Sequence, residues 1–297
     1  MSSIHIVIPC FNEADRLRQE AFRAFVSEQP DVSLLFVDDG STDGTATVLA
    51  RLCAEAPGQM RSLELEQNQG KAEAVRRGLL QALASGASYV GFWDADLATP
   101  LDAVDDFMMI FREKPKVEMV FGSRVKLMGW DIDRSRARHY SGRVFATVVS
   151  TLLRIPIYDT QCGAKIFRVT EATRHVFGEP FLSRWVFDVE VLARDLQMRW
   201  ADPGLVSIDE ALYEMPLRAW NDVEGSKVKA MDFFWAMRDV FRIYRRYLRK
   251  SIWRKGDKVV VLPSLPPGRS GETVAQRKEG PQETSPAGPL REVEPPA

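Results

Sequence analysis

The sequence predicts an α/β protein with a mostly parallel central sheet flanked by helices. Apolar segments of strand length alternate with longer segments of helical periodicity through the first half of the chain. These strands are apolar almost without interruption, as in a sheet that is covered on both faces. Two of them end in carboxylates, Asp38-Asp39 and Asp94-Ala95-Asp96, and ligands collect at the carboxyl ends of parallel strands.

The predicted elements follow one another as βαβ units. Strands are expected at residues 4–9, 32–37, 62–65, 89–93 and 117–122. Helices are expected at residues 14–27, 45–54, 71–83 and 101–112, since apolar side chains recur there at helical spacing. Ser41, Thr42 and Asp43 are residue types that cap a helix, which supports a start at Thr45. This succession is typical of nucleotide-binding α/β folds.

The acids at the end of residues 89–93 indicate a cation site. Successive side chains of extended chain point to opposite faces, so the small Ala95 lets Asp94 and Asp96 serve different neighbours. Mg²⁺ and Mn²⁺ prefer oxygen ligands and complete their shell with phosphate and water, so a bound diphosphate would supply the rest. The alternative is a pair of solvated loop residues. Asp38 and Asp39 are also neighbouring acids, and their charges repel each other unless hydrogen-bond donors bind them.

Two common phosphate-binding motifs are excluded. Gly70-Lys71 resembles the end of a Walker A loop, but Leu65 replaces its first glycine and Ala72 replaces its Ser or Thr. Gly40 and Gly44 do not complete a G-x-G-x-x-G pattern. A P-loop NTPase or a dehydrogenase is therefore not expected.

Seven motifs resemble the GT-A glycosyltransferases of family 2. The four general ones are Val7-Ile8-Pro9-Cys10-Phe11-Asn12-Glu13, residues 37–45, Asp94-Ala95-Asp96 and Gly122-Ser123-Arg124. Three more are similar to the dolichyl- and polyprenyl-phosphate β-glucosyltransferases, and more distantly to the mannosyltransferases: residues 159–167, 184–190 and 220–227. The resemblance spans residues 4 to about 250. It implies the GT-A fold and an inverting, metal-dependent hexosyl transfer.

The resemblance implies a role for individual residues. Those expected around the base and ribose of a nucleotide sugar are Pro9, Phe11, Glu13, Val37 and Asp39. Asp94, Ala95 and Asp96 would line the ribose and the metal-bound diphosphate, with Mg²⁺ or Mn²⁺ on both acids and Asp96 as the more direct ligand. Arg124 and Lys227 would reach phosphate. A surface arginine is the alternative for Arg124.

The donor is expected to be UDP-glucose rather than GDP-mannose. The related mannosyltransferases carry an Arg where this chain has Asn221 and Asp222, and a polar residue where it has Ala98. The glucosyltransferase branch has Ala at the latter position.

The acceptor decides which groups are catalytic. A polyprenyl or dolichyl monophosphate, with a second pKa near 6, is already nucleophilic at neutral pH. A hydroxyl of a soluble or glycan acceptor would need a base, for which Asp188 is the best candidate. The predicted catalytic residues are thus Asp96, Arg124 and Asp188, although Asp188 can also be an acid that begins a helix. A nucleotide-sugar sensor without catalysis is a further alternative, which the two metal-site acids argue against.

Two basic segments bear on a lipid acceptor. Arg136, Arg138 and Arg143 are candidates for the acceptor phosphate, against the alternative of a solvated helix face. Residues 231–255 are expected to form a basic amphipathic helix. Its apolar face is Phe233, Met237, Val240, Phe241, Tyr244, Leu248 and Ile252. We expect the first half to pack on the domain and residues 244–255 to rest on a membrane.

Composition sets the remaining expectations. The 297 residues suit one core, so we expect a single catalytic domain over residues 1–255. Residues 257–297 should be a disordered tail, because 263–297 hold eight of the 17 prolines. A net charge of −1 predicts no nucleic-acid partner. Apolar runs fall short of the roughly 18 residues that span a bilayer, and three cysteines indicate reduced thiols. We therefore expect a cytoplasmic protein, peripheral on the cytosolic membrane face.

Overall fold

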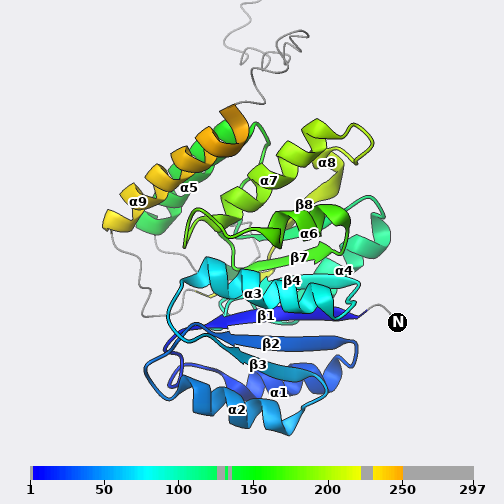
Figure 1. Cartoon of the computed structure of the whole chain (residues 1–297), viewed down its shortest axis with the longest axis vertical. Helices are drawn as coiled ribbons and strands as arrows, with labels where there is room; N and C mark the ends of the chain where they lie inside the picture. The colour runs from blue at the N-terminus through cyan, green and yellow to red at the C-terminus, as the bar shows by residue number, and fades with distance from the viewer. Residues whose placement is uncertain (1–2, 126–130, 133–135, 222–229, 250–297) are drawn as a thin grey trace, which may run out of the picture. The chain divides into compact units, whose positions relative to one another are not determined.

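The computed structural model describes residues 3–125, 131–132, 136–221 and 230–249 (Figure 1). Within that part, the side chains of residues 131–132, 136–141 and 230–233 are left out of the description. The chain divides into two units, Met1–Asp257 and Lys258–Ala297, and every described residue belongs to the first. The predicted tail at 257–297 and the end of the predicted helix at 250–255 lie outside the described residues.

The main sheet of the described part has seven strands in the order β3-β2-β1-β4-β7-β5-β8. They are β1 (Ile4–Cys10), β2 (Val32–Asp38), β3 (Met60–Glu64), β4 (Tyr89–Trp93), β5 (Met119–Ser123), β7 (Ala164–Arg168) and β8 (Leu212–Pro216). Only β7 among them runs antiparallel to its neighbours, β4 and β5. The prediction of a mostly parallel α/β sheet is therefore confirmed. The short strands β6 (Asp131–Ile132) and β9 (Ala219–Trp220) form a separate parallel pair.

The helices of the described part are α1 (Gln19–Glu28), α2 (Thr45–Glu55), α3 (Lys71–Ala84), α4 (Ala103–Glu113), α5 (Arg136–Leu153), α6 (Glu171–Gly178), α7 (Phe187–Ala201), α8 (Ile208–Ala211) and α9 (Ala230–Ile243), followed by the π-helical turn η1 (Tyr244–Leu248).

Helices cover both faces of the sheet, and successive residues of β1 point into different apolar layers. Ile6 and Ile8 lie in the layer that includes α1, α2 and α4, whereas Val7 lies in the layer with α3, α6 and α7. Helix α3 packs over β1, β2 and β4 (Figure 1).

Helix α1 begins at Gln19, five residues later than residue 14, where the sequence predicts it. The preceding segment is held instead by the loop after β2 and by the first residue of α2. Thr45 Oγ1 accepts a hydrogen bond from the amide of Glu13 at 2.8 Å, and Asp43 Oδ2 accepts one from the amide of Ala14 at 3.3 Å. Side-chain acceptors thus take the amides that a helix start would leave free.

The C-terminal helix buries a narrower stripe than its sequence predicts. Val240 and Ile243 are buried in the layer with α7, but Phe241 is 55% exposed. Phe234 and Trp235, in the half expected to pack on the domain, are also exposed. Position 241 lies about 100° around the helix from position 240, which carries it off the packed stripe. No helix in the described part of the chain is long and apolar enough to cross a bilayer.

Candidate active site

The acids that the sequence singles out meet at one edge of the sheet. Strand β1 pairs with both β2 and β4, so the two acid-ended strands lie on either side of it. Asp38 is the last residue of β2, and Asp94 directly follows β4. The two acidic segments therefore lie at the same edge of the sheet, as expected. The cation and nucleotide that they would bind stay a prediction.

Lys71 meets the first acid of the Asp94-Ala95-Asp96 motif. It is the first residue of α3, and its Nζ lies 2.5 Å from Asp94 Oδ1. Burial lowers the pKa of Lys71, but the carboxylates of Asp94 and Asp188 raise it more, so the ammonium form is favoured. Lys71 is not among the residues predicted from the sequence, because Gly70-Lys71 there resembles only an incomplete Walker A loop. The available sequence signal was a lysine that directly follows a glycine at a predicted helix N-terminus, where anions bind.

Asp94 is also fitted closely against the segment that leads into β7. Its amide donates to the carbonyl of Gly163 at 3.0 Å. A Cβ atom added to Gly163 would overlap the Asp94 carboxylate. Any residue with a Cβ atom at position 163 would displace this carboxylate, which explains why a glycine precedes β7.

Asp96 lies in a tight turn that Arg18 secures. Leu97 has a positive φ of 52°, and the Asp96 Oδ1 atom accepts from the amide of Ala98 at 3.0 Å. Arg18 Nη2 donates to the carbonyls of Asp96 and Leu97 at 2.8 Å each. Burial and the neighbouring charge of Asp94 raise the pKa of Asp96. Two carboxylates that repel each other favour a cation between them.

The donor set fits a divalent cation that brings further ligands with it. The described residues contain no group of three or more His, Cys, Asp or Glu side chains that could enclose a metal ion. Asp94 and Asp96 offer hard carboxylate oxygens, which suit Mg²⁺ and Mn²⁺. The remaining ligands would have to come from a phosphate-bearing molecule and water.

The acids of the loop after β2 find their donors within the protein. Asp39 Oδ1 accepts from the amide of Gln69 at 2.7 Å and Oδ2 from the amide of Gly70 at 2.8 Å. Burial nevertheless raises the pKa of Asp39. Asp38 Oδ1 accepts from the amide and hydroxyl of Ser41 at 3.0 and 2.5 Å. A ribose or base contact of Asp39 stays a prediction, and the amide bonds show that it also shapes the 66–70 loop.

The other predicted base and ribose residues gather around the ends of β1 and β2. Pro9 and Val37 are register partners in the β1–β2 pair, and Phe11 follows β1 as a partly buried side chain. The Glu13 carboxylate accepts from Arg16 Nε at 3.0 Å and Nη2 at 2.6 Å. Ala95 is buried between the two acids. Their contact with a nucleotide is not tested by this arrangement.

Arg124 is not the solvated surface arginine that the sequence left as an alternative. Its side chain is 15% exposed and forms two bonds to Asp159, Nε to Oδ2 at 2.6 Å and Nη2 to Oδ1 at 2.8 Å. The guanidinium also lies 5.4 Å from the ring centroid of Trp220. A phosphate would have to share this arginine with Asp159. Its predicted phosphate contact stays open.

Asp188 lies buried in the first turn of α7, as the helix-start alternative requires. It forms an ion pair with Lys165 Nζ at 2.7 Å. Lys165 is itself buried between the rings of Phe92 and Phe121, with Nζ 5.1 and 4.8 Å from their centroids. Burial raises the pKa of Asp188 and outweighs the lowering by Lys165 and Lys71. A raised carboxyl pKa is also what a general base needs, so the catalytic prediction stays open.

The predicted acceptor residues are only partly described. Arg143 stacks on Tyr158, with its guanidinium carbon 3.9 Å from the ring centroid. The amides of Tyr158 and Asp159 both donate to Glu214, at 2.7 and 2.8 Å. Arg143 is therefore joined to the segment that holds Arg124. The side chains of Arg136 and Arg138, and the whole of Lys227, lie outside the described residues.

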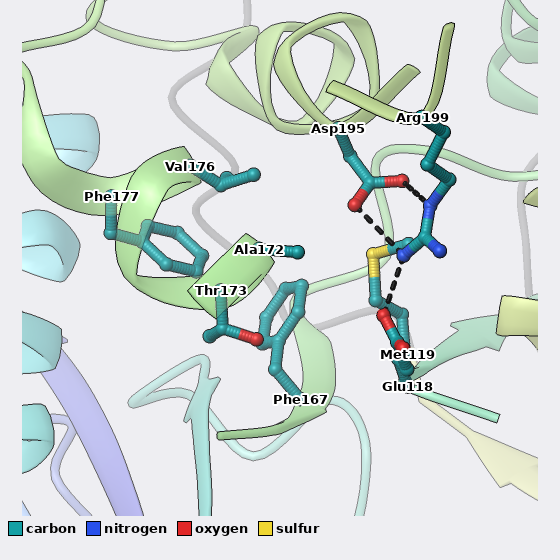
Figure 2. Close-up of a pocket in the computed structure, with 9 residues that line it drawn as sticks. All are labelled: Glu118, Met119, Phe167, Ala172, Thr173, Val176, Phe177, Asp195 and Arg199. Atoms are coloured by element: carbon teal, nitrogen blue, oxygen red, sulfur yellow. Dashed lines mark hydrogen bonds and ion pairs between the residues drawn. The ribbon is translucent and has the colours of Figure 1, made fainter. Parts of the chain in front are cut away.

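A small pocket at the opposite edge of the sheet is lined in part by an ion-paired cluster (Figure 2). It lies where Met119, the first residue of β5, pairs with Phe167 near the end of β7. Arg199 bridges Asp195 and Glu118, with Nε to Asp195 Oδ2 and Nη2 to Glu118 Oε2 both at 2.6 Å. Each charged group there already has a partner. We assign this cluster to the packing of α7 on the sheet.

Comparison with known proteins places the chain in a family. The family model described as glycosyl transferase family 2 matches residues 5–171. A dolichyl-phosphate beta-glucosyltransferase of Dictyostelium discoideum is 34% identical over 268 residues, covering 84% of this chain and 76% of that protein. The protein of the same name from Saccharomyces cerevisiae is 30% identical, with 82% and 75% covered.

Solved structures share the fold. Glucosyl-3-phosphoglycerate synthase from Mycobacterium tuberculosis, in complex with Mn²⁺, UDP-glucose and phosphoglyceric acid, aligns with a TM-score of 0.56. It is 18% identical, and the alignment covers 82% of this chain and 80% of that one. The family resemblance read from the motifs is confirmed. Since the family model matches more than half of its length, the chain belongs to glycosyl transferase family 2.

Proposed function

We propose that this glycosyltransferase moves glucose from UDP-glucose to a polyprenyl phosphate, with inversion at the anomeric carbon. The observation that carries the proposal is the pair Asp94 and Asp96, set beside Lys71 at the carboxyl edge of the sheet. The names of the relatives support the sugar and the acceptor, since proteins about one-third identical are dolichyl-phosphate beta-glucosyltransferases.

The donor half of the site would neutralise the leaving nucleotide. Asp94 and Asp96 would hold Mg²⁺ or Mn²⁺, and the solved Mn²⁺ and UDP-glucose complex of a protein of the same fold supports this assignment. The bound cation would offset the charge that develops on the departing diphosphate. Lys71 restrains the Asp94 carboxylate and adds a positive charge beside it.

The acceptor half would bring a phosphate to the sugar without a strong base. A phosphate monoester, with a second pKa near 6, is largely dianionic at neutral pH and already nucleophilic. Arg143, and the predicted Arg136 and Arg138, would attract it. In this reaction Asp188 orients Lys165 and need not accept a proton.

A second candidate function is transfer to a hydroxyl group. The raised pKa of the buried Asp188 favours it, because a carboxylate of this kind can take the hydroxyl proton. Asp188→Asn would then abolish transfer. With a phosphate acceptor, the same variant would keep most of its turnover per folded molecule, although loss of the buried carboxylate partner of Lys165 lowers its stability.

A lipid acceptor calls for contact with a membrane, and we propose that the C-terminal helix provides it on the cytosolic face. Phe234, Trp235 and Phe241 are 64, 46 and 55% exposed, although large aromatic side chains are usually covered. Exposed arginines lie beside them, with Arg238 4.4 Å from the Trp235 ring centroid and Arg245 5.9 Å from that of Phe241. Exposed aromatics among cations suit an anionic lipid surface. The predicted contact through 244–255 would extend this face.

The transfer assay uses vesicles that contain either a polyprenyl phosphate or the free polyprenol. The protein is incubated with Mn²⁺ or Mg²⁺ and with labelled UDP-glucose or GDP-mannose. We expect label in the organic phase only with UDP-glucose and the phosphorylated lipid. Label from GDP-mannose, or equal label with the free polyprenol, would contradict the proposal.

The membrane face is tested by sedimentation with anionic vesicles. The triple variant Phe234→Ser, Trp235→Ser and Phe241→Ser should lose vesicle binding. Met109→Ser is the matched control, because Met109 is an exposed apolar residue of α4 at 39% exposure. Equal sedimentation of the two variants would argue against a docking face on α9.

A further inference from the structure

The loop between β3 and α3, residues 65–70, is held by hydrogen bonds on two sides. On one side its partner is Asp39, in the donor half of the site. The carboxylate of Asp39 accepts the amides of Gln69 and Gly70. Gly40, with a positive φ of 64°, lets the two loops touch backbone to backbone, since a Cβ there would lie 2.6 Å from the Asn68 amide. The loop cannot shift without disturbing Asp39.

On its other side the same loop accepts hydrogen bonds from Arg184. Its Nε donates to the carbonyl of Gln69 at 2.9 Å, and its Nη2 donates to the Asn68 carbonyl at 3.2 Å and to Asn68 Oδ1 at 2.6 Å. Gly70 has a φ of 96°, and a Cβ added there would lie 2.7 Å from Arg184 Nε. The Arg184 side chain therefore lies directly on this glycine.

Arg184 also holds the beginning of α3. Its carbonyl accepts from the amide of Ala72 at 3.2 Å, in the first turn of the helix. The preceding residue is Lys71, whose ammonium meets Asp94. A single exposed arginine thus contacts the segment that connects Asp39 on one side with Lys71 on the other. Its side-chain hydrogen bonds go to this segment, and its positive charge also acts to lower the pKa of Asp39.

The segment that carries Arg184 is tied in turn to the C-terminal helix through Glu190. Glu190 is fully buried, and its Oε2 accepts from the amide of Leu182 at 2.7 Å. Arg194 donates to Glu190 and to the carbonyls of Glu179 and Pro180. Tyr247 of η1 donates its hydroxyl proton to Glu190 Oε1 at 2.9 Å. The last described turn of the chain therefore bonds to the anchor of the Arg184 segment.

We propose that Arg184 is a positioning residue for the nucleotide diphosphate, and that the Tyr247–Glu190 bond transmits the position of the C-terminal helix to it. The diphosphate ligand rests on the proposed function. The consequence is that donor affinity depends on a helix that carries the exposed aromatic face. Arg184 acts mainly by holding the loop, so its loss weakens donor binding more than it slows the chemical step.

The first test uses Mn²⁺–UDP binding by calorimetry and amide hydrogen exchange at Gln69 and Gly70. Arg184→Gln should raise the Kd about fivefold, the value of one or two partly exposed charge-assisted hydrogen bonds, and speed exchange of both amides. The Kd of Arg184→Lys, which keeps the charge, should lie between those of the wild type and Arg184→Gln. The control is Arg77→Gln, because Arg77 bonds within α3 to Glu73. In transfer assays KM for the donor should rise while kcat stays within about twofold.

The second test asks whether the helix and Arg184 act on one path. Tyr247→Phe should raise the Kd about twofold, the loss of one hydrogen bond, and should add nothing in the background of Arg184→Gln. Effects that multiply would overturn the proposed transmission. An Arg184→Gln variant that binds Mn²⁺–UDP as tightly as Arg77→Gln would overturn the positioning role. Wild-type protein that binds no Mn²⁺–UDP is a different result, and it contradicts the proposed function.

Discussion

The ammonium of Lys71 lies 2.5 Å from the Asp94 carboxylate, so the first residue of α3 supplies a cation to the first acid that follows β4. The two side chains are 25 and 35% exposed, which leaves the pair open to a ligand. The N-terminus of α3 adds the positive end of the helix dipole at the same point. Both features favour a diphosphate at this edge of the sheet.

Lys71→Met should therefore reduce function far more than stability. We expect kcat/KM for glucosyl transfer to fall at least about tenfold, because the Asp94 carboxylate loses its partner and the site loses a positive charge. The free energy of unfolding should fall by no more than about 1 kcal/mol, since the pair is partly exposed. Lys71→Arg, which retains the charge, should keep more activity. Wild-type kcat/KM in Lys71→Met would contradict a role of Lys71 in the site.

Gly163→Ala should displace Asp94. The added methyl would overlap the carboxylate, so the acid has to leave its present position. We expect the Kd for Mn²⁺–UDP, measured by calorimetry, to rise at least about tenfold, with about 1–3 kcal/mol of lost stability from overpacking. Gly178→Ala is the control, because a Cβ there meets no atom within 4 Å. Equal affinities of the two variants would refute the close fit.

Arg199→Met should destabilise the fold without touching the site. Arg199 is 4% exposed and its partner Asp195 is 2% exposed, so the change leaves a buried carboxylate without its cation. The cost should be about 3–5 kcal/mol in urea unfolding. The exposed pair of Lys116 with Glu210 is the comparison, and Lys116→Met should cost under about 1 kcal/mol. Similar costs would show that burial does not decide the strength of these pairs.

The same cluster predicts a pH dependence of stability. Burial raises the pKa of Asp195 despite the opposing effect of Arg199, so the folded protein binds this proton more tightly than the unfolded chain does. The contribution of Asp195 should therefore fall as pH rises from the unfolded pKa of about 3.9 through the folded pKa, by up to about 1.4 kcal/mol per pH unit. Urea unfolding of wild type and Asp195→Asn measures the difference. A difference that grows with pH would reverse the sign and contradict the shift.

The sequence predicts the elements whose pattern is set by local chemistry. The strand at 89–93 matches β4, and the helix predicted from residue 71 matches the start of α3. It does not predict β7, because Lys165, the second residue of this strand, interrupts the apolar pattern. That lysine is buried only because Asp188, distant in sequence, neutralises it. Pairing between remote charges leaves no periodic pattern in the sequence.

The site shows the same division. The paired acids are visible as motifs, since chemistry requires carboxylates at a strand end. Arg18, Lys71 and Arg184 were not found, because each acts through a contact across the fold. Phe241 was assigned to the packed stripe of the last helix, yet it is exposed. One residue along a helix turns a side chain by about 100°, which is enough to move it off the packed stripe.

The central claim is that Asp94 and Asp96 hold a divalent cation on which the donor diphosphate is bound, and calorimetric titration of UDP with and without Mn²⁺ tests it most directly. Wild-type protein should bind UDP only with Mn²⁺, and Asp96→Asn should lose at least about tenfold in affinity. Asp102→Asn, at an exposed acid before α4, should bind as wild type does. Unchanged Mn²⁺-dependent binding by Asp96→Asn would contradict the account.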